Sequence, residues 1–356
     1  QVAATSNVNE LFQHFGLPPG DRLGGSAAWK SSIEIKHLQT DLVLESDLVG
    51  VSSRLPEPLA KAAAEPLALR LEKTAGDDGR EHYRMTLGAV AQAVAIRRPE
   101  GLERAAVALG SAAATLPDSG VAVRVAVPRV DADAWKEVWA ATGSGARGAS
   151  TMPALAVVSI RPPVLRLFGH DYTEVDTVLQ PRDDGWRIAL NMQQAAGELI
   201  WRGAGEGSLA GRLQRMVIRP AAAAGGGPNA ALLKTLPALN LAVDDFRIGD
   251  KALGQLDLRA RNEQGAWHLE TLHLRNPDGA LNGTAVWRND GAGRHQTRLD
   301  FGLTASDVGK LLNRLGYVDA IRRGTATLAG SMQWNGPLNA IDYPSLTGEM
   351  TVRADD

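Results

Sequence analysis

The chain has 356 residues with 38 basic and 40 acidic side chains, a balance that lacks the positive charge of a nucleic-acid-binding surface. It contains no cysteine, which excludes disulfides, thiolate catalysis and zinc sites built on thiolates. Hydrophobic residues make up 44% of the chain and aromatic residues 5%, so its apolar content is mostly Ala, Val and Leu in short runs. None of these runs approaches the roughly 20 residues that a membrane-spanning helix needs.

A glycine followed four positions later by a tryptophan occurs four times. The pairs are Gly25 with Trp29, Gly197 with Trp201, Gly283 with Trp287, and Gly330 with Trp334. In an extended strand, residues i, i+2 and i+4 share one face, so each glycine and its tryptophan point the same way. Each pair also ends a strand-like run, and this recurrence predicts a repeated β architecture.

Short runs of alternating apolar and polar residues follow one another along most of the chain. They occupy residues 32–36, 41–45, 66–72, 81–88, 92–98, 102–109, 121–127, 164–168, 186–190, 211–218, 240–243, 255–259, 267–270, 271–275, 298–303 and 325–334. Turn sequences rich in Asp, Asn and Gly separate several of them. Because alternation gives a sheet one apolar and one polar face, the sequence predicts an antiparallel, mainly β protein.

Three segments have the apolar spacing of short helices instead: residues 7–16, 131–139 and 306–316. In the last of these, Val308, Leu311 and Leu315 share a stripe. Ser306 is the predicted N-cap and Gly316 the predicted C-terminal stop.

The low-complexity stretch 221–228, four alanines followed by Gly-Gly-Gly-Pro, is the best candidate for a boundary. We interpret it as a flexible loop between two parts, 1–220 and 229–356, of one continuous β architecture. Two independent domains are the alternative.

Motifs for catalysis are weak. The glycines of residues 143–148 have dinucleotide-binding spacing, but a predicted helix precedes them and a strand follows, the reverse of the context that this motif needs. Paired aspartates fit caps and turns, and His268 and His273 lack a third ligand nearby. The sequence therefore predicts a protein that is not an enzyme and has no metal or cofactor.

Several stretches, in their order along the chain, resemble the YhdP branch of the AsmA-like envelope proteins, which are relatives of TamB. They are residues 66–70, 127–135, 236–249, 256–261, 274–278, 297–301, 306–312 and 345–350. The resemblance covers most of the chain.

This resemblance implies an elongated, twisted antiparallel sheet curled into a hydrophobic groove, with three short helices interrupting it. It implies that phospholipids move along the groove between the inner and outer membranes of Gram-negative bacteria. The chain would then be a middle-to-late segment of a periplasmic protein that is anchored in the inner membrane and reaches both membranes through other parts. We expect a monomer whose partners are phospholipids rather than nucleic acid.

Aliphatic strand faces are the predicted lipid-binding set, because acyl chains need only apolar contact. The candidates are Leu42, Leu44, Leu67, Leu69, Leu71, Val121, Val123, Val125, Leu165, Leu167, Ile188, Leu190, Leu239, Leu241, Val243, Leu256, Leu258, Leu299, Phe301 and Leu303. The same residues would form the core of a closed sandwich if the protein is instead an envelope scaffold. A third hypothesis is a carbohydrate-binding surface on Trp186, Trp201 and Trp287.

Overall fold

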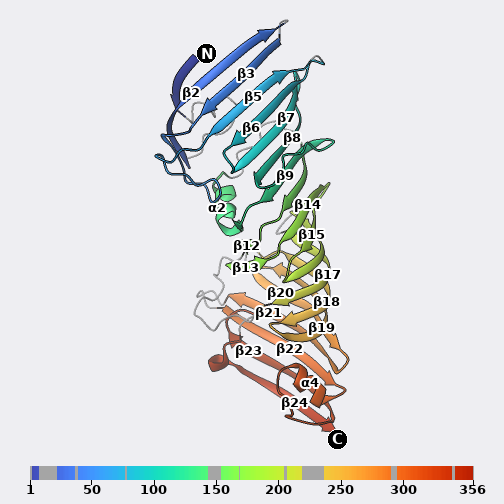
Figure 1. The fold of residues 1–356 in the computed structure, drawn as a ribbon. Helices are drawn as coiled ribbons and strands as arrows, with labels where there is room; N and C mark the ends of the chain where they lie inside the picture. The colour runs from blue at the N-terminus through green and yellow to red at the C-terminus, as the bar shows by residue number, and fades with distance from the viewer. Residues whose placement is uncertain are drawn as a thin grey trace. The chain divides into compact units, whose positions relative to one another are not determined.

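A computed structural model shows two compact units, Gln1–Pro181 and Arg182–Asp356, both built almost entirely from strands (Figure 1). It describes residues 2–7, 22–36, 39–76, 78–142, 154–167, 169–203, 207–218, 236–289, 295–338 and 341–355. Strands account for 67% and helices for 6%, which confirms the mainly β prediction. The predicted loop 221–228 lies outside the described residues, so the division at that loop stays a prediction.

In the first unit, part of one large sheet is accompanied by a small three-stranded sheet and a helix. The elements are β1 (Val2–Asn7), β2 (Leu23–Lys36), β3 (Gln39–Ser46), β4 (Val51–Ser53), β5 (Leu69–Ala75), β6 (Glu81–Leu87), β7 (Ala91–Arg98), β8 (Gly101–Gly110), β9 (Gly120–Ala126), β10 (Arg129–Asp131), α2 (Ala132–Thr142), β11 (Leu155–Ile160), β12 (Val164–Leu167), β13 (His170–Thr173) and β14 (Asp176–Arg182). Strands β10, β12 and β13 form the small sheet, and α2 lies beside β12.

In the second unit, successive strands pair with their neighbours in chain order. They are β15 (Gly185–Asn191), β16 (Ala195–Arg202), β17 (Ser208–Ile218), β18 (Ala238–Ile248), β19 (Lys251–Glu263), β20 (Ala266–Asn276), β21 (Gly279–Asn289), β22 (His295–Ala305), β23 (Thr325–Asn335) and β24 (Thr347–Asp355). Helix α4 (Val308–Arg314) and the 3₁₀ turn η1 (Tyr343–Ser345) interrupt them.

The large sheet is mixed, which corrects the expectation of a purely antiparallel one. Its 21 described strands do not close on themselves. The pairs β8–β9, β9–β11 and β17–β18 are parallel, whereas the other pairs described in the large sheet are antiparallel. A parallel pair needs a crossover connection in place of a tight turn. The alternation of side chains is the same in both kinds of pair, so it does not predict strand direction.

Both helices that lie within the described residues occur where their apolar spacing predicts them. The N-cap of α4 is Asp307 rather than Ser306: its carboxylate accepts a hydrogen bond from the backbone N–H of Lys310 at 2.9 Å. Gly316 follows the C-cap Leu315 with φ +94°, a left-handed conformation that suits glycine and ends the helix. The predicted helix at 7–16 falls outside the described residues, except for Asn7 at the end of β1.

Three of the tryptophans of the second unit form a structural row at one end of its strands. Trp267, Trp287, Thr297 and Trp334 are register partners across β20 to β23, and all four are buried. The indole N–H of Trp334, whose side chain is 1% exposed, donates to the carbonyl of Pro337 at 3.0 Å. The burial of Trp287 leaves little ring surface for a sugar to stack on.

We expect Trp334→Ala to lower the free energy of unfolding by about 3–5 kcal/mol, because it leaves a large cavity and removes a buried hydrogen bond. Urea unfolding followed by circular dichroism measures the change. The control is Tyr343→Ala, since this ring is 76% exposed and its removal should change stability little. Equal effects of the two substitutions would contradict a structural role for the tryptophan row.

Candidate functional site

Strand register brings apolar residues of the first unit together on one side of its sheet. One row of register partners runs from β2 to β14: Ser31, Leu44, Leu71, Met85, Ala93, Val107, Val123, Val158 and Leu179. A second row beside it contains Ile33, Leu42, Lys73, Tyr83, Ala95, Ala105 and Val121. Partners in register point to the same side of a sheet. We call this side the first apolar face.

The second unit has a longer surface of the same kind, the second apolar face. One row contains Ile188, Leu199, Gly211, Leu241, Leu258, Leu272, Gly283, Phe301, Gly330 and Met350. The next row contains Leu190, Gly197, Leu213, Val243, Leu256, Leu274, Leu281, Leu303, Leu328 and Val352. None of these side chains is charged.

Much of this second apolar face is only half-buried. Leu241, Leu258 and Leu272 are partly accessible, and at the edge strand β24 Met350 is 57% and Val352 54% exposed. The described strands form one large sheet and one three-stranded sheet, so within them no second large sheet packs across this face. Leu199, Leu213, Val243 and Leu256 of the same rows are buried in one core cluster, so the face combines a packed core with partly accessible leucines.

Helix α4 covers one end of the second apolar face. Leu311 lies in a small buried cluster against which Leu303, Leu315 and Leu328 pack. Leu315 also packs against the buried cluster around Val243. An ion pair holds the helix in place: Arg314 Nη2 lies 2.5 Å from Asp278 Oδ2, and the aspartate, in the β20–β21 turn, is buried. Access to this end of the face is therefore limited by α4.

The opposite side of the second-unit sheet is charged. Its ion pairs join neighbouring strands or lie along one strand: Arg212 with Asp244, Arg261 with Glu270, Arg275 with Asp257, Arg298 with Asp300, and Arg187 with Glu198. Exposed pairs of this kind contribute little stability each. These charged side chains make this side of the sheet hydrophilic, in contrast to the second apolar face.

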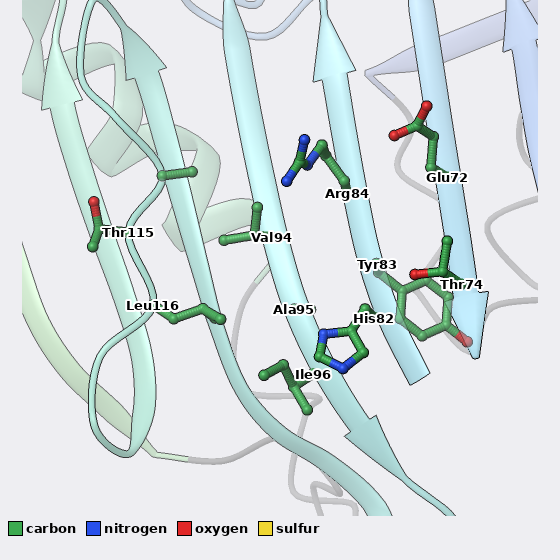
Figure 2. Close-up of a pocket in the computed structure, with 11 residues that line it drawn as sticks. Glu72, Thr74, His82, Tyr83, Arg84, Val94, Ala95, Ile96, Thr115 and Leu116 are labelled. Atoms are coloured by element: carbon green, nitrogen blue, oxygen red, sulfur yellow. The ribbon is translucent and has the colours of Figure 1, made fainter. Parts of the chain in front are cut away.

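The opposite side of the first-unit sheet carries a cavity of about 570 Å³. Figure 2 shows Val94, Ile96 and Leu116 lining it together with the charged Glu72 and Arg84. Its volume is in the range of small-molecule pockets. Within the described residues, no cluster of three or more His, Asp or Glu side chains could hold a metal ion.

One group of polar residues interrupts the first apolar face; we call it the polar cluster. Glu81 forms one ion pair with Lys73 Nζ at 2.5 Å and another with Arg97 Nη1 at 3.2 Å. The Tyr83 hydroxyl donates to the same carboxylate at 2.8 Å. The hydrogen bond from Lys73 is the main cause that lowers the pKa of Glu81 from 4.5 to about 2, and the same bond raises the pKa of Lys73.

Most of the predicted lipid-binding residues are brought together on these two faces, but three are placed elsewhere. Leu67 precedes β5 and reaches toward Gly88. Leu165 and Leu167 belong to β12 of the three-stranded sheet. Whether any of the residues contacts lipid stays a prediction.

Sequence reasoning did not single out several residues of the same rows. They include Met85, Val107, Leu199, Leu213, Leu272, Leu274, Leu281 and Leu328. Their alternation with polar neighbours is the signal that could have found them. The described helices include none that is both long and apolar enough to cross a bilayer.

Fold and surface together define a class of protein: an open, mainly β sheet with one apolar and one charged side. The model of the YhdP protein family matches residues 1–356, and the chain therefore belongs to the YhdP family, as its sequence resemblance indicated. The chain is also similar to the intermembrane phospholipid transporter YhdP of Escherichia coli K12. The identity is 29% over an alignment of 228 residues, and the match covers 57% of this chain and 17% of the relative. No solved structure matches.

The polar cluster makes stability depend on pH in a defined window. Glu81 has a lower pKa when folded, so its ion pairs stabilise the fold above its ordinary pKa and stop doing so as the pH falls from 4.5 toward 2. We expect Glu81→Gln to remove this part of the acid destabilisation, measured as the thermal midpoint between pH 2 and pH 7. The control is Glu65→Gln, because Glu65 is exposed. Parallel pH profiles for wild type and Glu81→Gln would contradict the assignment.

Proposed function

We propose that this chain is a segment of a bridge that carries phospholipids between the inner and outer membranes along its apolar faces, with no covalent chemistry. The observation that carries the proposal is the second apolar face, whose uncharged rows extend from β15 to β24 and keep partly accessible residues, such as Leu241, Leu258 and Leu272, beside a buried core. Membership of the YhdP family and similarity to the E. coli phospholipid transporter support phospholipid as the cargo.

An apolar surface of this kind suits acyl chains because they need contact without hydrogen bonds. Each methylene that leaves water contributes about 0.8 kcal/mol, and any aliphatic side chain supplies the contact. Neighbouring positions along the rows are therefore similar in energy for a chain that moves from strand to strand. The head group can stay in water at the strand ends, so the lipid moves without breaking a bond.

The charged opposite side would face the aqueous surroundings. Under this proposal the segment works in the periplasm as a monomer, and parts of the protein outside this chain contact the two membranes. The aligned region covers 17% of the E. coli relative, which leaves most of that protein for such roles.

A photo-crosslinking pair tests the proposal on one strand. Leu272 and His273 are neighbours on β20 that point to opposite sides of the sheet, the first in a row of the second apolar face and the second exposed. We expect a photo-reactive residue at position 272 to capture phospholipid in cells, while the same residue at position 273 does not. Mass spectrometry of the adducts identifies the lipid.

The matched substitutions are Leu258→Asp and Arg259→Asp on the facing strand. Leu258 is the register partner of Leu272, so a carboxylate at that position should abolish capture there, whereas Arg259→Asp should not. Circular dichroism confirms that both variants keep their strands. Equal capture from positions 272 and 273, or no lipid from either, would favour a scaffold with a covered face.

A further inference from the structure

Charged side chains are rare on the apolar faces, and on the first of them they gather at one place. Among the strand residues that share the first apolar face by register, the charged ones are Lys73, Glu81 and Arg97. They come from β5, β6 and β7, and all of them belong to the polar cluster.

The cluster has more positive charge than its single carboxylate neutralises. Two cations, Lys73 and Arg97, share Glu81, which leaves a net charge of +1. Lysine has three N–H donors and arginine five. Each donates to Glu81, and the remaining donors are free for an additional acceptor at an accessible position, since Arg97 is 49% and Lys73 26% exposed.

The polar cluster lies beside the apolar rows, on the same side of the sheet. Lys73 lies on the same side of β5 as Leu71 and Leu69, at the end of that strand. At about 3.3 Å per residue, Leu69 is about 13 Å from Lys73 along the strand. A molecule with an apolar tail on Leu69 and Leu71 would thus place its other end at the cluster.

We propose that the polar cluster binds the phosphate of a phospholipid whose acyl chains lie on the first apolar face. This inference rests on the proposed function and deepens it, because it assigns a fixed head-group site to a surface that otherwise recognises only tails. The planar guanidinium of Arg97 can donate two parallel hydrogen bonds to phosphate oxygens, and Lys73 adds a point charge. Glu81 holds both cations in place and limits how tightly the phosphate binds, so that a lipid can leave.

The test compares two lipids with identical tails by native mass spectrometry of the purified chain. Dioleoylphosphatidylglycerol carries the phosphate, and dioleoylglycerol lacks it. We expect the double variant Lys73→Met with Arg97→Met to bind the phospholipid about tenfold more weakly, the effect expected for loss of a hydrogen bond between charged groups. Binding of dioleoylglycerol should not change.

Two further variants separate a binding role from a structural one. Arg70→Met removes an ion-paired arginine from the opposite side of β5, and we expect it to leave both affinities unchanged. Glu81→Gln removes the competing carboxylate, and we expect tighter phospholipid binding, whereas a purely structural cluster would predict no gain. Circular dichroism checks the fold of each variant.

The outcomes distinguish this inference from the proposed function. If wild type binds both lipids but the cluster variants do not alter the preference for phosphate, the head-group site is wrong and lipid binding stands. If wild type binds neither lipid, both proposals fail.

Discussion

The register of the backbone ladder is the constraint on which both apolar faces depend. Side chains alternate along a strand, so a slip of one residue would send a strand's apolar set to the charged side. The β-bulges correct the phase where the sequence breaks alternation. Leu269 and Leu272 are three positions apart, yet they pair with Ala285 and Gly283, which are two apart. The bulge keeps both leucines on the second apolar face.

The same correction recurs on β18, where Val243 and Phe246 pair with Leu256 and Gly254. Gly254 has φ +104°, and a Cβ there would lie 2.1 Å from the carbonyl oxygen of Arg275, so no other residue fits without a shift of the backbone. Bulges and their glycines are therefore part of what makes the face continuous. A sheet without them would mix leucines with arginines on both sides.

The spacing of apolar residues predicted those features that depend only on neighbouring residues. The alternating runs and the amphipathic helix near 306–316 occur in the structure, because each needs only its own residues. Strand partners depend on distant residues instead. Leu165 and Leu167 alternate like any other strand leucines, but they belong to the three-stranded sheet. The parallel pairs were missed for the same reason, and the polar cluster needs the register of three strands before its members meet.

Because the leucine surface is partly accessible, a ligand that binds to it would also increase the stability of the fold. Half-buried apolar side chains still have contact area to gain, and a ligand that binds only the folded chain stabilises it by mass action. Under the proposed function, a phospholipid would thus be both the cargo and the cover of the faces, while the ion-paired opposite side stays in water. Under the same proposal the sheet need not close on itself, because the bound lipid would complete its apolar layer. Helix α4, held by the ion pair of Arg314 with Asp278, already covers one end of the second apolar face, so the proposal assigns lipid exchange to the remaining rows.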